Sequence, residues 1–293
     1  MISVIICSRD DKSLQLVSRN VKSTVGVPYE IIGVDNRKGE YSICQAYNIG
    51  ASQSKYDILC FMHEDICFHT QEWGSIVEDI LSDQTVGVLG VAGSEYQIKA
   101  PSSWWSIGAQ FNRIQILQKL PGKDSELLSA NPKETGLADV AVLDGLWLCS
   151  RKDVWLQHKF DEKTFKDFHF YDVDFCASIF PHYRICVTFD ILIEHFSNGT
   201  INKPWLINAL KYQAKYKSAL PFGVVSVDKE QNALLEKNAT HDFVKRLIDM
   251  GAPHSLILSN IVKLASYSLT DKHLVNLIKR YIRNNILKKA NVE

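Results

Sequence analysis

The stretch "DILCFMHEDICF" (residues 57–68) places three ionisable side chains, His63, Glu64 and Asp65, directly after an apolar run. The run from Ile58 to Met62 has the length and continuous apolar character of a fully buried strand. The charges after it can simply be solvated where the strand reaches the surface, or they can form a functional site at the end of the strand. The rest of the chain has to distinguish these two interpretations.

Short apolar runs alternate with helical patterns over the first hundred residues. Strands are expected at 2–7, 29–36, 57–62 and 86–93, and the segments between them show apolar residues at helical spacing. This order predicts an α/β fold with a mostly parallel central sheet that is covered by helices on both faces. Ligands of such sheets bind beyond the carboxyl ends of the strands, so the polar ends of the first three strands should meet on one rim.

The second half of the chain has a different pattern. Residues 95–138 break the alternation and predict a long irregular loop, which is usually functional or mobile. Strand and turn patterns then resume, and beyond residue 200 the sequence becomes helical. We therefore expect a main domain at 1–220 and a helical C-terminal region at 221–293.

Composition narrows the function and the location. The 33 basic residues balance 33 acidic ones, so a chain-wide basic field for nucleic acid is absent and no nucleic-acid partner is expected. The seven cysteines form no CxxC pair and lie mostly in apolar runs, which favours buried free thiols over zinc ligands or disulfides. The start lacks a basic leader, and no apolar run approaches the ~18 residues of a membrane span, so a cytoplasmic protein is expected.

Six motifs follow one another over roughly residues 1–200. They read "SVIICSRDD", "IIGVDNRKG", "AYNIGASQSKYDILCFMHEDI", "LDGLWLCSRKDVW", "FYDVDFCASI" and "LIEHFSNG". Together they resemble the family-2-like inverting glycosyltransferases of the GT-A fold. The resemblance implies transfer of a sugar from a nucleoside-diphosphate sugar, with a UDP-sugar as the expected donor, to a glycan or lipid-linked acceptor. It also implies a Mn²⁺ or Mg²⁺ cofactor and a role in cell-surface polysaccharide or glycoconjugate synthesis.

The charged strand end matches the metal-binding segment of that family. A departing diphosphate gathers negative charge, which a divalent cation held by carboxylate oxygen neutralises. The resemblance makes Asp65 the metal ligand, with His63 and His195 completing the site. His63 stands where the family usually has an Asp, and imidazole is a poorer partner for magnesium. Asp65 can instead be a solvated strand end, and His195 an ordinary core histidine.

The resemblance also implies a donor-nucleotide set. Its members are Ser8, Arg9, Asp35, Asn48 and Glu64. Asp35 would accept hydrogen bonds from the base or ribose, although a turn-forming role is the alternative. Arg9 can equally be a surface charge, and Glu64 can point inward to the sheet or to the sugar.

An inverting transfer needs a base that removes the proton of the acceptor hydroxyl. The family's acidic pair aligns with Tyr171-Asp172, which makes Asp172 the candidate base although Tyr171 replaces the usual Glu. Asp174 is the second acid of this motif and is expected near the sugar and the acceptor. A helix-capping role is the alternative for either Asp.

Four further residues are expected near the sugar and the acceptor. Asp144-Gly145 matches the family segment that flanks them, and Gly145 would permit a close approach of the backbone or simply form a turn. Trp104 and Trp105 lie in the irregular stretch, where their indole faces suit sugar C–H surfaces. Hydrophobic anchoring of the loop is the alternative for both.

The C-terminal helical pattern combines basic and apolar side chains. The basic residues are Lys279, Arg280, Arg283, Lys288 and Lys289. The apolar residues that share one helical face are Leu274, Leu277, Ile278, Tyr281 and Ile282. Such a helix can lie on an anionic membrane as a peripheral contact at the inner face of the cell membrane, or pack on its own protein.

Two other functions compete with the glycosyltransferase. A non-catalytic nucleotide- or glycan-binding module on the same fold would account for His63 and Tyr171, which depart from the family pattern. A nucleotidyltransferase fits less well, because no glycine-rich phosphate loop follows the first strand.

Overall fold

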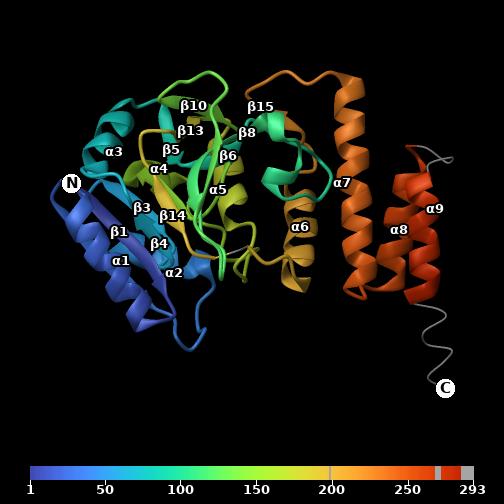
Figure 1. Ribbon diagram of the computed structural model, residues 1–293, viewed down its shortest axis with the longest axis horizontal. Helices are drawn as coiled ribbons and strands as arrows, with labels where there is room; N and C mark the ends of the chain where they lie inside the picture. Colours follow the sequence, from blue (N-terminus) through green and yellow to red (C-terminus); the bar gives the residue numbers. More distant parts are fainter. Residues whose placement is uncertain (198, 268–271, 285–293) are drawn as a thin grey trace.

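The structure is a computed structural model that describes residues 1–197, 199–267 and 272–284 (Figure 1). In this part of the chain a central sheet has seven strands, in the order β10 (Leu137–Val140), β13 (Arg184–Thr188), β5 (Val86–Gly90), β12 (Trp147–Arg151), β3 (Ile58–Met62), β1 (Ile2–Ser8), β2 (Tyr29–Asp35). All of them run in one direction except β10 and β12. The predicted α/β fold with a mostly parallel central sheet is confirmed.

Helices cover both faces of this sheet, because successive residues of a strand point to opposite sides. The helices that follow or connect its strands are α1 (Asp11–Thr24), α2 (Ile43–Gln53), α3 (Trp73–Ser82), α4 (Lys152–Gln157) and α5 (Tyr171–Ile179). α1 and α3 pack on the face that carries Val4 and Ile6. α2 and α5 pack on the face that carries Ile5. The continuous apolar runs of β1 and β3 are thus explained by burial on both sides.

A second, smaller sheet lies beyond the carboxyl end of β3. Its path is β11 (Val142–Leu143), β6 (Ala92–Ser94), β8 (Asn112–Gln118), β14 (Ile193–His195) and β4 (Ile66–Phe68), with β9 (Glu126–Ala130) paired to β8. β4 runs antiparallel to β14 and pairs His195 with Ile66. This pairing brings the end of a late strand next to Asp65, the residue before β4.

The second sheet corrects the prediction of one irregular loop over residues 95–138. Only the segment around the two short 3-10 helices, Trp104–Ser106 and Ala109–Phe111, lacks strands. β8 alternates the apolar Ile114 and Ile116 with Gln115 and is a half-buried strand. The prediction was wrong because β8 and β9 are interrupted by polar residues and are only partly buried, so they lack the continuous apolar run of a central strand.

The C-terminal helices extend outward from the side of the main sheet that α2 and α5 cover, and the last two pack on the helix before them. They are α6 (Lys203–Lys215), α7 (Lys229–Asp249), α8 (His254–Ala265) and α9 (Lys272–Ile282) (Figure 1). Between α6 and α7, β15 (Phe222–Gly223) pairs with β7 (Tyr96–Gln97). The division into 1–220 and 221–293 stays a prediction.

The apolar face predicted for the last helix packs on the protein itself. Leu274, Leu277 and Tyr281 are buried, whereas Ile278 and Ile282 are exposed. Of the predicted basic residues, Lys288 and Lys289 lie outside the described residues. None of the described helices combines the length and the apolar character that are needed to span a bilayer.

Two cysteines require a correction. Cys60 of β3 and Cys149 of β12 face each other across neighbouring strands and form a disulfide. The prediction of free thiols is wrong for this pair, although it is confirmed for Cys7, Cys44, Cys67, Cys176 and Cys186. The sequence did not reveal the pair, because 89 residues separate its members and only the antiparallel placement of β12 beside β3 joins them.

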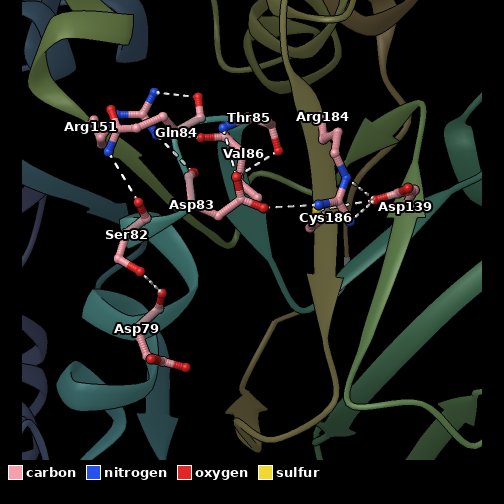
Figure 2. Close-up of polar contacts among 10 residues, drawn as sticks. All are labelled: Asp79, Ser82, Asp83, Gln84, Thr85, Val86, Asp139, Arg151, Arg184 and Cys186. Carbon is pink, nitrogen blue, oxygen red and sulfur yellow. Dashed lines mark hydrogen bonds and ion pairs between the residues drawn. The ribbon is translucent and has the colours of Figure 1, made fainter.

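Two arginines lie at the rim of the central sheet opposite the carboxyl ends of β1, β2 and β3, and both are hydrogen-bonded to neighbouring segments (Figure 2). Arg151 at the end of β12 donates to the carbonyl oxygen of Val86 at 2.6 Å and that of Gln84 at 3.2 Å. Arg184 at the start of β13 donates to the carboxylates of Asp83 and Asp139. These arginines hold β5, β12 and β13 together, so their charges have a structural role.

Candidate active site

A cavity of about 530 Å³ opens beyond the carboxyl ends of β1, β2 and β3, on the rim where the sequence predicts a site. Four of the predicted site residues line it, namely Arg9, His63, Glu64 and Asp65. The segment Lys166 to His169 and the start of α6 complete the lining. The three charged residues after β3 therefore face a cavity instead of open solvent.

His63, Asp65 and His195 form a group that can hold a metal ion. One ligand atom from each of the three lies within 4.8 Å of the others. The Asp65 Oδ1 atom is 3.7 Å from His63 Nδ1 and 3.8 Å from His195 Nε2. The two histidines are largely buried, with side chains 14% and 12% exposed, whereas 35% of Asp65 is exposed toward the cavity. The structure thus brings together the three residues predicted as metal ligands.

Tyr171 determines which nitrogen of His63 faces Asp65. The Tyr171 hydroxyl donates to the carbonyl oxygen of Gly145 at 2.9 Å and lies 2.7 Å from His63 Nε2. A carbonyl oxygen can only accept, so the single hydroxyl proton goes to Gly145 and the hydroxyl accepts from His63 Nε2–H. Burial lowers the pKa of His63, which keeps the ring neutral at neutral pH. Its Nδ1 atom therefore carries the lone pair, as a metal ligand must.

Gly145 is required for this arrangement. A Cβ atom at this position would lie 2.0 Å from the Tyr171 hydroxyl oxygen, which is far inside van der Waals contact. Tyr171 itself is 3% exposed, and burial raises the pKa of its hydroxyl well above the usual value, so the hydroxyl keeps its proton. The Asp144-Gly145 motif and the Tyr171-Asp172 motif thus contact each other directly, through Gly145 and the Tyr171 hydroxyl.

The same Gly145 peptide also holds Asp172. Its N–H donates to Asp172 Oδ2 at 3.0 Å, while its carbonyl oxygen accepts from Tyr171. Burial, together with the charge of Asp144, raises the pKa of Asp172 to about 7. A carboxyl group with this pKa can take up a proton near neutral pH. Phe170, just before α5, has φ 69°, a left-handed conformation that is costly for a bulky residue and is often found at functional sites.

Glu64 lines the cavity, and its carboxylate is also hydrogen-bonded to the end of β1. Its carboxylate accepts from the Ser8 hydroxyl at 2.8 Å, from Arg9 N–H at 3.0 Å and from Asp10 N–H at 3.4 Å. Glu64 therefore fixes the loop that carries Arg9 at the cavity wall. The roles of Ser8, Arg9 and Glu64 toward a nucleotide stay predictions.

Two predicted donor residues lie away from the cavity wall. Asp35 accepts from three nitrogens of Arg37, and these hydrogen bonds lower the pKa of Asp35 to about 2. Asn48 donates to the Phe160 carbonyl oxygen and to Glu162, both at 2.9 Å. The structure does not bring Asn48 to the cavity; its amide instead ties α2 to the segment after α4.

The predicted sugar and acceptor residues divide into two groups. Trp104 donates from its indole nitrogen to Asp144 Oδ2 at 3.0 Å, which places this indole beside the Asp144-Gly145 turn, whereas Trp105 is 52% exposed. Asp174 is 2% exposed and accepts from Lys215 of α6 at 2.7 Å. Asp174 thus fastens α5 to α6, and the structure does not bring it to the sugar site.

The family comparison accounts for this arrangement over most of the chain. The model of the family described as "Glycosyltransferase like family" matches residues 3–220. The chain belongs to this family. The match includes every element that contributes a side chain to the site described above, and it ends before α7. The GT-A type of fold predicted from the six motifs is confirmed.

Two solved structures are similar to this glycosyltransferase-like chain at low sequence identity. GalNAc-T7, solved with UDP, GalNAc and Mn²⁺, is 10% identical with a TM-score of 0.47, and the match covers 68% of this chain and 43% of GalNAc-T7. The chain thus spans less than half the length of that protein. The mannosyltransferase PcManGT from Pyrobaculum calidifontis, solved with GDP-Man and Mn²⁺, is 11% identical with a TM-score of 0.44, and the match covers 98% and 87% of the two chains. The search of curated proteins found no match.

Several residues that line the cavity were not predicted from the sequence. Lys166, Phe168 and His169 line the cavity, and the Phe168 ring lies 5.2 Å from that of His63. Tyr41, before α2, lines it as well. The only signal available was position, because "KDFHF" directly precedes the Tyr171-Asp172 motif.

Proposed function

We propose that this protein is a metal-dependent glycosyltransferase that moves a sugar from a nucleoside-diphosphate sugar to an acceptor hydroxyl with inversion at the anomeric carbon. The observation that carries the proposal is the Gly145 peptide. It holds the candidate base Asp172 through its N–H, and through Tyr171 it orients His63 of the metal-binding group.

The side chains present fit a divalent cation. His63, Asp65 and His195 offer two imidazole nitrogens and one carboxylate oxygen, which suit Mn²⁺ better than the oxygen-preferring Mg²⁺. Three protein ligands leave coordination positions for a diphosphate and water. A cation bound there would offset the negative charge that develops on the leaving diphosphate.

Asp172 would act on the acceptor. As the acceptor oxygen forms its bond to the anomeric carbon, Asp172 takes the hydroxyl proton. The bond from the anomeric carbon to the phosphate oxygen breaks, and the nucleoside diphosphate leaves with the electron pair. A single displacement of this kind inverts the configuration at the anomeric carbon. The pKa of about 7 leaves much of Asp172 unprotonated at neutral pH and able to perform this step.

Two cations at the cavity wall suit the diphosphate. Arg9 and Lys166 line the cavity, and neither forms an ion pair with another described residue. The exposed Phe168 ring, next to His63, offers a flat apolar surface to a base or a sugar. These groups would bind and orient the donor before transfer.

A donor screen tests the proposal. Thermal-shift measurements with a panel of nucleotide sugars, each with and without Mn²⁺, should show one donor that raises the melting temperature more when the metal is present. Incubation with that donor and a range of acceptors should release the nucleoside diphosphate. Stabilisation without any transfer or hydrolysis would favour the non-catalytic binding module, and no stabilisation by any donor would contradict both functions.

The finer identities stay proposals. A UDP-sugar is the proposed donor, a glycan or lipid-linked molecule the acceptor, and surface polysaccharide or glycoconjugate synthesis the role. A cytoplasmic location, peripheral to the inner face of the membrane, is proposed from the sequence alone. The Cys60–Cys149 disulfide counts against it, because such bonds are rare in the cytoplasm.

A further inference from the structure

A second cavity of about 480 Å³ lies between α7 and α9, in the part of the chain beyond the family match. Figure 1 shows α8 and α9 at the end of the molecule opposite α1 and β1. The lining side chains come from one face of each helix: His241 and Lys245 from α7, and His273, Asn276, Leu277, Lys279, Arg280 and Arg283 from α9 and the residue after it. No carboxylate lines this groove among the described residues.

The basic groups of the groove are largely available to a ligand. Lys245, Lys279 and Arg283 are exposed and form no ion pair with any other residue that the structure describes. Arg280 is bound to Asp249 through Nε at 2.6 Å, which leaves its two terminal nitrogens for another partner. A further acid, Asp242, lies 3.3 Å from His241 Nδ1 and does not line the groove. The whole chain has equal numbers of basic and acidic residues, so the excess of positive charge is confined to the region of the groove.

We propose that the groove between α7 and α9 binds a phosphate group, and that the phosphate is the headgroup of an anionic lipid. Guanidinium groups bind phosphate oxygens in pairs, and lysines add charge, so cations on both walls suit a phosphate group. The site lies outside the matched family region and does not depend on the donor chemistry proposed above.

The outer surface of the same helices favours a lipid over a free phosphate. Three apolar side chains of α9 are exposed, Val275 by 43%, Ile278 by 37% and Ile282 by 40%. On α8, which contacts α9, Val262 is 69% exposed. No acidic residue occurs from Lys272 to Asn284. Exposed apolar side chains next to unpaired basic ones are typical of protein surfaces that lie in the headgroup region of a membrane.

Vesicle binding by the whole protein tests the proposal. The protein is sedimented with vesicles of phosphatidylglycerol and phosphatidylcholine, and with vesicles of phosphatidylcholine alone. We expect binding to the anionic vesicles only, weakening as salt is raised. The triple variant Lys245→Gln, Lys279→Gln, Arg283→Gln should bind about a hundredfold more weakly, because each basic residue near an anionic surface contributes about fivefold.

A matched variant separates a site from general charge. Lys22→Gln, Lys123→Gln, Lys133→Gln removes the same charge from exposed positions that do not line the groove. It should bind vesicles within about threefold of the unaltered protein. An equal loss in both triple variants would overturn the proposal, as would vesicle binding that the groove variant leaves intact.

A second measurement distinguishes the two sources of phosphate. Calorimetry with glycerol 3-phosphate and with inorganic pyrophosphate is run without a membrane on the unaltered protein and on the groove variant, so that only the binding lost in the variant is assigned to the groove and not to the first cavity. Binding of these ions that the groove variant loses, combined with no vesicle binding, would overturn the lipid as the source and assign a soluble phosphate instead. Unchanged donor stabilisation in the groove variant would show that the variant is folded and that a failure here is separate from a failure of the transferase function.

Discussion

The cavity at the ends of β1, β2 and β3 and the groove between α7 and α9 are both lined by basic side chains, but they use charge differently. The first mixes Arg9 and Lys166 with three carboxylates and two histidine rings, and a backbone peptide fixes the geometry of its buried groups. The second holds almost only positive charge, on exposed and flexible side chains. Buried, hydrogen-bonded groups suit chemistry on one bound molecule, whereas exposed cations suit attraction to a charged surface.

The largest expected effect is a loss of catalytic rate at the candidate active site, whose groups are buried. Asp172→Asn removes the proton acceptor but keeps a side chain that can still accept from Gly145 N–H. We expect kcat to fall by about 10²- to 10⁴-fold, the usual contribution of a positioned base. Mn²⁺ affinity, measured by calorimetry, should stay within about threefold because the metal-binding group is intact. A rate within tenfold of the unaltered enzyme would remove Asp172 from the role of base.

The next largest effect concerns stability and contrasts a buried ion pair with a more exposed one. Lys215 bridges Asp161 and Asp174, the latter with its side chain 3% exposed, so Lys215→Met leaves a buried carboxylate without its cation. We expect the free energy of unfolding to fall by about 3 kcal/mol. Arg280→Gln at the groove removes a pair in which both side chains are about a third exposed, and should cost much less than Lys215→Met. Urea denaturation of both variants measures the difference, and equal losses would contradict this ranking.

The fold was predictable from sequence where its causes are local. β1, β2, β3 and the helices between them follow from continuous apolar runs and from helical spacing, and the ends of these strands indicated the rim of the site. β12 was not predictable as the neighbour of β3, since its antiparallel insertion depends on contacts with residues about ninety positions away. β8 and β9 of the second sheet were missed for a different reason, because neither has the continuous apolar run of a central strand.

The site shows the same division. The grouping of three residues that can hold a metal ion was predictable, because His63 and Asp65 lie in one motif and His195 ends an apolar strand. The bond from Tyr171 to His63 joins residues 108 positions apart, and it connects the two positions at which this chain departs from the family pattern. His63 and Tyr171 looked in the sequence like two independent departures from the family pattern, but in the structure they are hydrogen-bonded to each other. The Asp174–Lys215 and Asn48–Phe160 contacts were likewise invisible, so these two polar residues were assigned to the site although they hold helices in place.

Tyr171→Phe tests whether this bond supports metal binding. The ring should keep its packing, while His63 Nε2–H and the Gly145 carbonyl oxygen lose their partner. Loss of the group that orients a metal-binding histidine typically weakens metal affinity about 10- to 100-fold. Titration with Mn²⁺ alone would show this, and nitrogen NMR of the histidines should show His63 as a mixture of tautomers. Tyr47→Phe is the matched control, because Tyr47 lies beside Tyr171 and its hydroxyl forms no hydrogen bond with a described residue. Equal affinities in Tyr171→Phe and Tyr47→Phe would show that the bond has no role in metal binding.

The smallest expected effect is a shift in the pH dependence of the rate. A base must be unprotonated to act, so with a pKa of about 7 for Asp172 the rate should rise with pH and reach half its plateau near neutrality.

The nearby charge of Asp144 contributes to this raised pKa. Asp144→Asn removes that charge and keeps one acceptor oxygen. Leu146 N–H and the Trp104 indole donate to different oxygens of Asp144, so one of the two hydrogen bonds is lost. The pKa of Asp172 should then fall, because its ionised form is no longer repelled, and the midpoint should move to lower pH. Burial, the larger cause, is unchanged, so the midpoint should remain above the usual range of an aspartate. A midpoint that stays in place would show that burial alone sets the pKa, and one that moves to higher pH would contradict the assignment of Asp172 as the group that titrates.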